Sequence, residues 1–162
     1  MIRRAQNTNS GTGLLASAQR GSLDAFNQQV LEYQDAAWNL AFHLLWNEAA
    51  ADEVVQQAIQ QMYRNRWRLR RGSFRIKLFC SIVQNCQRRL KQPINNLSPD
   101  TLKQSEGNAS ARLVSLPLPE RIVLVLSELE GLGAHEISQV TGTSIPVVRQ
   151  RLGIALAACL NS

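Results

Sequence analysis

Ten basic side chains lie within one short stretch of this 162-residue sequence, and the stretch contains no acidic residue. The cations are Arg64, Arg66, Arg68, Arg70, Arg71, Arg75, Lys77, Arg88, Arg89 and Lys91. Cations at this density attract polyanions, and binding by counterion release weakens steeply with salt. Trp67 and Phe74 stand among them, and flat rings can stack on unpaired bases. The stretch predicts single-stranded nucleic-acid binding, and a solvated basic face with core aromatics is the alternative.

A second group of polar residues precedes the basic stretch. It combines an acidic pair with a row of amides: Asp52, Glu53, Gln56, Gln57 and Gln60. Apolar residues at intervals of three and four place this group on one face of a helix from about residue 51 to 66. Carboxylates and amides can hydrogen-bond a basic helix of a partner protein. A solvated helix face is the alternative.

A third group lies near the carboxyl end and contains Ser144, Val147, Arg149, Gln150 and Arg151. Arginine can pair bidentately with guanine edges, and glutamine with adenine edges. The group follows a turn at residues 142–144 between two short apolar-periodic segments, 134–141 and 145–160. Two such helices predict a helix-turn-helix with Ser144 as a helix cap, and a plain helical hairpin is the alternative.

Other kinds of site find little support in the sequence. Cys80, Cys86 and Cys159 are odd in number and lack CxxC spacing, and the two histidines, His43 and His135, have no ligand-spaced partner. We expect buried thiols, no metal, no cofactor and no small-molecule substrate, and we expect that the chain is not an enzyme. The chain contains no apolar run long enough for a bilayer and no signal peptide at its start, which predicts a cytoplasmic protein without a membrane partner.

The elements that carry these groups are all expected to be helices, because three-and-four spacing recurs while period-two alternation does not. We predict an all-α fold of two small helical domains. Residues 1–20 form a flexible lead, residues 21–91 a first domain, residues 92–115 a linker, and residues 116–162 a second domain. In the first domain a long helix follows a cap at Ser22, and a third helix buries Phe79, Ile82, Val83, Cys86 and Leu90.

The linker holds two prolines, a glycine and several serines, and it would let the domains sit apart on a partner. Beyond it, a helix with Ile122, Val123, Val125, Leu126 and Leu129 facing inward should end at Gly131. From Pro93 onward six acids outnumber five bases, so this half carries a net charge of −1. The last helix is almost wholly apolar after residue 152. We expect Ile154 and Leu156 to cover the core of the second domain, and contact with a partner is the alternative.

Four motifs of the amino-terminal half resemble region 2 of the extracytoplasmic-function sigma factors. They are Gly21-Ser-Leu-Asp-Ala-Phe26, the run Ala51 to Ile59, Gly72-Ser-Phe-Arg75 and Ile82-Val-Gln-Asn85. The carboxy-terminal half resembles region 4 of the same family, through Leu116-Pro, the run Glu128 to Leu132, Glu136-Ile, Gly142 and Val148-Arg-Gln-Arg-Leu152. Both regions occur in the family's order, separated by a linker.

The resemblance implies a role for each group of residues. The face from Asp52 to Gln60 would bind the β′ clamp helices of core RNA polymerase, whose β flap is a further partner. The segment from Arg64 to Arg89, with Asn85, would melt and bind the minus-ten element of promoter DNA, and the loop 68–73 would take a flipped base. The helix-turn-helix would meet the minus-thirty-five element. An anti-sigma factor is a further possible partner.

Two departures from the family pattern bear on these roles. Gln57 stands where the family usually has an acid, and the last helix lacks the family's further arginines. The leading hypothesis is an alternative sigma factor. The alternatives are a sigma-derived protein that occupies polymerase, or a helix-turn-helix regulator, with weak or no promoter specificity of its own.

Overall fold

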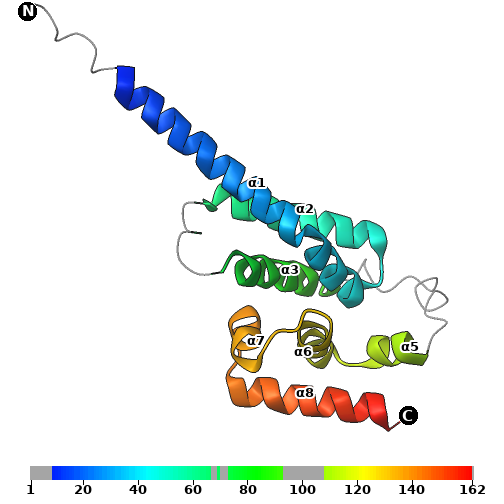
Figure 1. Cartoon of the computed structure of the whole chain (residues 1–162). Helices are drawn as coiled ribbons and strands as arrows, with labels where there is room; N and C mark the ends of the chain where they lie inside the picture. Colours follow the sequence, from blue (N-terminus) through cyan, green and yellow to red (C-terminus); the bar gives the residue numbers. More distant parts are fainter. Residues whose placement is uncertain (1–8, 67–68, 70–72, 93–107, 162) are drawn as a thin grey trace, which may run out of the picture.

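The computed structural model of the chain describes residues 9–66, 69, 73–92 and 108–161. Within this part every regular element is a helix, so the all-α prediction is confirmed. The α-helices are α1 (Asn9–Leu45), α2 (Glu48–Arg64), α3 (Phe74–Leu90), α5 (Asn108–Ser115), α6 (Leu118–Glu128), α7 (Ala134–Thr141) and α8 (Ile145–Leu160). Figure 1 shows α3 between the first two helices and a layer that contains α6 and α7, with α8 beyond them.

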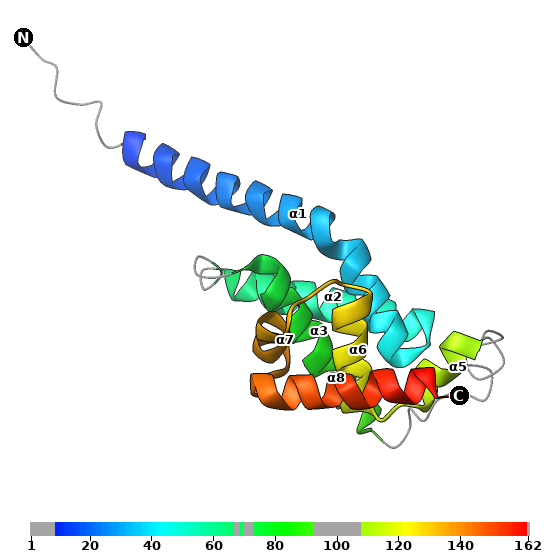
Figure 2. The ribbon, with the colours of Figure 1, turned by 60° about the horizontal axis from the view of Figure 1, so that its bottom comes forward.

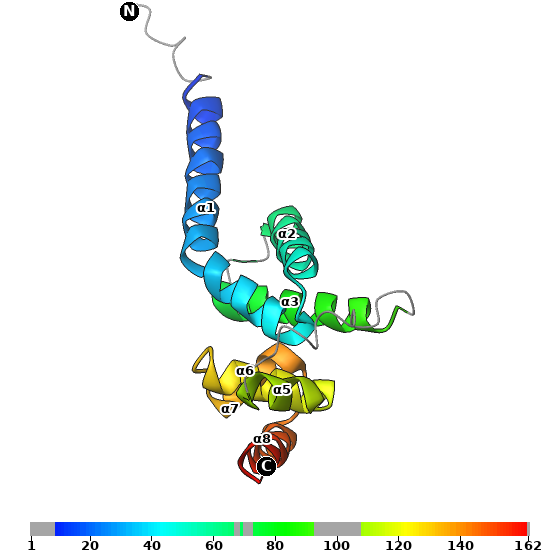
Figure 3. The ribbon, with the colours of Figure 1, turned by 90° about the vertical axis from the view of Figure 1, so that its right-hand side faces the viewer.

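Helix α1 begins at Asn9, which is much earlier than the predicted start beside Ser22. The helix therefore runs through most of the predicted flexible lead, and Figure 3 shows its amino-terminal part extending away from the other helices. The sequence here contains no proline, and Leu14, Leu15, Ala16 and Ala18 are good helix formers.

Helices α1, α2 and α3 pack together around a core that includes Leu40, Leu44, Val54, Phe79 and Ile82. Side chains cap two of these helices. The Oδ1 atom of Asn47 accepts the Ala50 amide at 2.9 Å, which places the start of α2 at Glu48, three residues before the predicted start. The Ser73 hydroxyl accepts the Ile76 amide at the start of α3. Each cap satisfies a backbone donor that the helix itself leaves open.

The carboxy-terminal half contains the two predicted helices α7 and α8 with the predicted bounds. Gly131, with φ of 66°, follows α6, and Gly142, with φ of 68°, ends α7. Both conformations lie in the left-handed region that favours glycine. Helix α5 lies inside the predicted linker, so residues 108–115 are helical and not extended. The predicted inward position of Leu129 is wrong, because this side chain is 52% exposed beyond the end of α6.

The two halves pack against each other through one continuous apolar core. Helix α7 packs on α3, and α6 packs on α1. The core cluster joins Leu78 and Phe79 of α3 to Ile122, Ile137 and Val148 of the carboxy-terminal half. Figure 2 shows α6, α7 and α8 gathered beside α3 rather than apart from it. The helices thus form a closed arrangement, although the linker was predicted to let the domains sit apart.

Buried Arg121 joins helices from both halves. Its guanidinium donates to the carbonyl oxygens of Leu44 at 3.1 Å, Val114 at 2.5 Å and Leu116 at 3.0 Å. These carbonyls lie at or just beyond the carboxyl ends of α1 and α5, where backbone acceptors lack helical partners and a cation complements the helix dipole. Burial lowers the pKa of the Arg121 guanidinium.

Candidate nucleic-acid interface

The predicted basic surface lies at the carboxyl end of α2 and along α3. Arg64, Arg66, Arg88 and Lys91 are exposed, as expected for phosphate-binding cations. Arg66 lies over the Tyr63 ring, with its guanidinium carbon 4.4 Å from the ring centroid. Trp67, Arg68, Arg70 and Arg71 were also predicted to bind DNA, but they lie outside the described residues.

Two arginines of α3 are engaged by carboxylates. Arg89 pairs with Glu53 of α2 at 2.5 Å. Arg75 donates a hydrogen bond to the backbone oxygen of Glu130, and its guanidinium lies 3.9 Å from the Glu130 carboxylate. Burial raises the pKa of the Glu130 carboxyl, and the charge of Arg75 opposes this rise. Both arginines therefore have partners within the chain.

Two predicted DNA contacts on α3 occupy interior positions. Phe74 meets the Phe26 ring edge-on, with centroids 5.6 Å apart, and stacks on Tyr33 at 6.2 Å. Asn85 is only 4% exposed, and its amide nitrogen lies 3.5 Å from Oε1 of Gln61. Asn85 is buried with Gln61 as its partner, and Phe74 is partly buried against the core. Their role as DNA contacts stays a prediction.

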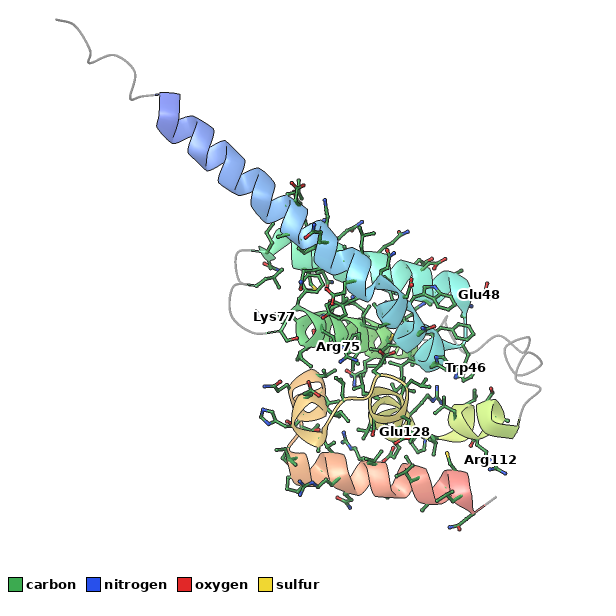
Figure 4. The ribbon with its side chains drawn as sticks, viewed as in Figure 1. Trp46, Glu48, Arg75, Lys77, Arg112 and Glu128 are labelled. Carbon is green, nitrogen blue, oxygen red and sulfur yellow. The ribbon has the colours of Figure 1, made fainter. Side chains whose placement is uncertain are left out.

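A shallow pocket of about 230 Å³ lies between the carboxyl end of α2 and the first half of α3, and its lining surface is mostly apolar. It is lined by Gln61, Met62, Asn65, Leu69, Lys77 and Ser81. The Ser81 hydroxyl donates to Oε1 of Gln61 at 3.0 Å, which orients that amide. Figure 4 shows Lys77 near the amino-terminal end of α3. Amides, a hydroxyl and a cation beside an apolar wall suit the polar edge and flat face of an unpaired base.

Most of these lining residues were missed by the sequence analysis. Gln61, Asn65 and Ser81 lie on two different helices, and only the packing of α2 on α3 brings them together. Lys77 was the one predicted for its charge. The row of amides along α2 was the only signal that could have indicated Gln61.

The polar face of α2 is exposed at all five predicted positions, Asp52, Glu53, Gln56, Gln57 and Gln60. The indole Nε1 of Trp38 donates to the Asp52 carboxylate at 2.7 Å, and Arg89 holds Glu53. Neighbouring helices thus orient the two carboxylates. The amides of Gln56, Gln57 and Gln60 are exposed beside them on the same helix.

The helix-turn-helix leaves its predicted reading residues accessible. Arg149 and Gln150 are exposed, Val147 and Arg151 are partly exposed, and exposed Ser144 precedes the first residue of α8. Ser144 occupies the cap position, but its side chain makes no cap hydrogen bond, so the expected capping contact is not formed. The amino-terminal turns of α8 therefore present two full cations and one amide.

The prediction that Ile154 and Leu156 cover the core is wrong, because these side chains are 50% and 37% exposed. Ala155 is the residue of this stretch that is buried. Leu156 lines an apolar groove of about 420 Å³ with Leu113, Leu124 and Leu129. Figure 4 places Trp46, Arg112 and Glu128 near the same region, and all three also line the groove. The excess of apolar residues in α8 was the signal in the sequence that could have indicated this groove.

A family model described as "Sigma-70, region 4" matches residues 108–159, which are α5 to nearly the end of α8. The chain is also 23% identical, over 163 aligned residues, to the ECF RNA polymerase sigma factor SigE of Mycolicibacterium smegmatis. The chain is thus similar to an extracytoplasmic-function sigma factor, and its carboxy-terminal part is similar to sigma region 4. That alignment includes 88% of this chain and 63% of the relative, so the chain spans less than two thirds of the length of this curated relative.

Two solved structures share the fold over most of this chain. One is described as "Structure of CnrH in complex with the cytosolic domain of CnrY"; it has a TM-score of 0.68 and 24% identity, and covers 90% of this chain and 92% of that chain. The other is the sigma factor RpoE in complex with the anti-sigma factor NepR from Bartonella quintana, with a TM-score of 0.71 and 15% identity. That match covers 85% of this chain and 95% of RpoE.

The region 4 match begins at residue 108, inside the predicted linker, and thereby includes α5. The boundaries proposed for the two domains and the lead stay predictions. In the described residues no helix has the length and apolar character needed to cross a membrane.

Proposed function

We propose that the chain is an alternative sigma factor of the extracytoplasmic-function type, which binds core RNA polymerase and directs promoter recognition and melting. The observation that carries this proposal is a region 4 match on α5–α8 in the same chain as a basic helix beside a shallow pocket lined by Gln61, Asn65, Lys77 and Ser81. The chemistry of RNA synthesis would belong to the polymerase, so the chain itself would be a non-enzymatic factor that works in the cytoplasm.

Core polymerase would contact the exposed face of α2. Asp52, Glu53, Gln56, Gln57 and Gln60 share this face, and internal contacts hold the two carboxylates in place. Fixed acceptors reduce the ordering cost when a basic helix such as the β′ clamp docks. The β flap would dock on the carboxy-terminal half, where the apolar groove beside Leu129 and Leu156 offers a surface.

Promoter DNA would be bound at two places. The minus-ten element would lie as a single strand along the basic surface, with Arg64, Arg88 and the loop arginines on phosphates and a flipped base in the shallow pocket. The minus-thirty-five element would meet Val147, Arg149, Gln150 and Arg151 at the start of α8. With only two arginines there, binding of duplex DNA by this half alone should be weak.

Reconstituted transcription tests the proposal. We expect promoter-specific transcripts when the full chain is added to purified core polymerase, and none from core polymerase alone. If the chain binds core polymerase but yields no specific transcript, it is instead a sigma-derived protein that occupies polymerase without choosing promoters.

Matched variants of α2 test the polymerase contact. Changing Gln56→Lys together with Gln57→Lys adds two positive charges to the proposed docking face, and we expect about a tenfold weaker complex with core polymerase. Asp24→Lys changes the net charge equally at an exposed position of α1, outside the proposed face. Equal affinities for the two variants would place the polymerase contact elsewhere.

One observation favours a second candidate function. Beyond Arg151 the exposed part of α8 is apolar, with Ile154, Leu156 and Leu160 where phosphate-binding cations would be expected. An apolar surface without phosphate-binding cations on α8 is what we expect of a sigma-derived protein that occupies polymerase without choosing promoters. Such a protein would bind core polymerase, compete with other sigma factors and leave promoter-specific transcription absent.

An anti-sigma factor is a proposed further partner. The RpoE structure is of a complex with the anti-sigma factor NepR, and the CnrH structure is of a complex with the cytosolic domain of CnrY. These relatives support a search for a protein that binds this chain and blocks its docking on polymerase. Loss of polymerase binding on addition of that protein would identify it.

A further inference from the structure

A tryptophan of α1 holds one carboxylate of the proposed polymerase-binding face. The indole Nε1 of Trp38 donates a hydrogen bond to Oδ1 of Asp52 at 2.7 Å. Phe42, one turn further along α1, stacks on this indole with ring centroids 5.1 Å apart and ring planes 4° apart. Parallel stacking restricts the rotation of the indole, so its single N–H stays directed at the carboxylate. The orientation of Asp52 therefore depends on two aromatic rings of a neighbouring helix.

The second carboxylate of this face is held from α3. Nη1 of Arg89 lies 2.5 Å from Oε2 of Glu53, and the two side chains are 27% and 56% exposed. A hydrogen bond between two charged groups is stronger than one between neutral groups. A carboxylate has roughly four acceptor sites, so Glu53 can accept from a partner protein while it stays paired with Arg89. Glu53 is the more exposed member of the pair and remains accessible on the face of α2.

Arg88 and Arg89 are neighbours in the sequence with different surroundings. Successive residues of an α-helix point about 100° apart, so the two side chains leave α3 in different directions. Arg88 is exposed, and among the described residues no carboxylate forms an ion pair with it. Arg89 is partly buried and bound to α2. Both were predicted to bind DNA from their charge, but only Arg88 has the surroundings of a phosphate-binding cation.

We propose that Trp38 and Arg89 are positioning residues for polymerase binding. Each fixes one carboxylate on the face of α2, and Arg89 acts on polymerase through Glu53 instead of contacting a DNA phosphate. A side chain that is fixed in advance need not be ordered when a partner docks, which corresponds to about fivefold in affinity for each carboxylate. The inference rests on the proposed function, because that function assigns the face of α2 to core polymerase.

Matched arginine variants test the role of Arg89. Arg89→Met and Arg88→Met each remove one positive charge from the same end of α3. With the full chain and purified core polymerase, we expect the Arg89→Met complex to be about fivefold weaker than the Arg88→Met complex. With a single-stranded oligonucleotide the order should reverse, and the log–log salt slope should be shallower by about 0.7 for Arg88→Met than for Arg89→Met. Arg89→Lys keeps a cation beside Glu53 and should restore most of the affinity for core polymerase.

A double-mutant cycle separates positioning from a general effect on folding. If Arg89 acts through Glu53, Arg89→Met should change polymerase affinity by less than about twofold once Glu53→Gln has removed the charge that Arg89 holds. A loss of α3 packing would instead weaken binding equally in both backgrounds. Circular dichroism should show equal helix content for all of these chains. If a methionine variant loses helix, Arg89→Gln and Arg88→Gln form the replacement pair.

Trp38 and Asp52 form the second cycle. Trp38→Phe keeps a ring that can stack on Phe42 and removes the indole donor. We expect Trp38→Phe to weaken the polymerase complex by about fivefold in the otherwise unaltered chain, and by less than about twofold in the Asp52→Ala background.

An Arg89→Met chain that binds core polymerase as tightly as Arg88→Met, or more tightly, would overturn the role of Arg89. Tighter binding would show that the ion pair competes with the partner for Glu53. Additive losses in either cycle would replace positioning by a general structural role. If the unaltered chain forms no complex with core polymerase, the proposed function fails and this role fails with it. A tight complex that is indifferent to all the variants removes only the positioning.

Discussion

Arg75 and Arg89 show how packing assigns roles to side chains of one type. Each lies on α3 in the basic stretch, and each meets a carboxylate from another element, Glu130 after α6 and Glu53 of α2. Among the described residues no carboxylate forms an ion pair with exposed Arg88 on the same helix, which leaves it available for phosphate. Composition identified the basic stretch, but the sequence offered no means of sorting its cations, because the partners lie far away in the chain.

Phe74 and Asn85 were assigned to DNA from motif and residue type, and both are turned inward. The periodicity of α3 indicated where these two side chains lie on the helix. Phe74, Leu78, Ile82 and Cys86 follow one another at intervals of four, so Phe74 continues the buried face of the helix. Asn85 lies beside Cys86 at the edge of that face, where an amide partner from α2 permits burial.

The three cysteines should differ in their reactivity. Cys86 is fully buried, and desolvation raises the pKa of its thiol to about 12, so it carries almost no thiolate at neutral pH. Desolvation also raises the pKa of half-buried Cys80. We expect a thiol reagent at pH 8 to leave Cys86 unmodified in the folded protein and to modify it in urea.

Cysteine-to-serine variants at positions 80 and 159 identify the residual thiol in that experiment. Mass spectrometry of the doubly substituted protein then follows Cys86 alone. Rapid modification of Cys86 without denaturant would mean that the contact between α2 and α3 opens readily, and it would contradict the buried position of this thiol.

Among the elements, short helices with clear end signals were predicted best. Helices α7 and α8 have the predicted bounds, since a glycine or serine stands at each junction and apolar residues repeat between them. Helix α5 was missed because prolines and asparagines earlier in the linker outweighed an eight-residue segment, which is too short to show a firm period. The early start of α1 was missed because a cap at Ser22 is equally compatible with a helix interior.

Two glycines of the helix-turn-helix should respond to alanine in opposite ways. Gly142 has φ of 68°, and Gly153 lies inside α8 without positive φ; an added Cβ meets nothing within 4 Å at either site. Because space does not differ, the backbone decides the outcome. Gly142→Ala should lower the free energy of unfolding by about 1 kcal/mol, whereas Gly153→Ala should raise it by about 0.5–1 kcal/mol.

Urea denaturation followed by circular dichroism gives both free energies. Gly153→Ala serves as the control for Gly142→Ala, because each adds the same methyl group, one in the turn after α7 and the other inside α8. Equal effects of the same sign would show that the turn adopts another conformation in solution.

At the scale of the whole molecule, the sequence predicted the helical class and a two-part organisation but not the contact between the parts. Each half was treated as a small core that closes on itself, whereas the core residues of α3, α6 and α7 form one cluster. Apolar periodicity shows which face of a helix is buried and does not identify the element that buries it. The net charge of −1 on the carboxy-terminal half is opposite in sign to that of the basic half. The sequence alone could not show that Glu130 of this half contacts Arg75.

Arg121 tests how strongly the closed arrangement depends on one buried cation. It donates to carbonyls near the ends of α1 and α5, and no carboxylate pairs with it among the described residues, so its desolvation is offset by backbone acceptors. Arg121→Met keeps a long apolar stem but leaves three carbonyls without this donor. We expect a loss of roughly 2–3 kcal/mol in the free energy of unfolding, since each hydrogen bond to a charged group contributes more than a neutral one and removal of the buried charge recovers part of the loss.

Arg149→Met, at an exposed position of α8, should change this free energy by less than about 0.5 kcal/mol. Chemical denaturation of both variants measures the difference, and an Arg121→Met protein as stable as the unaltered chain would show that apolar packing alone joins the two halves.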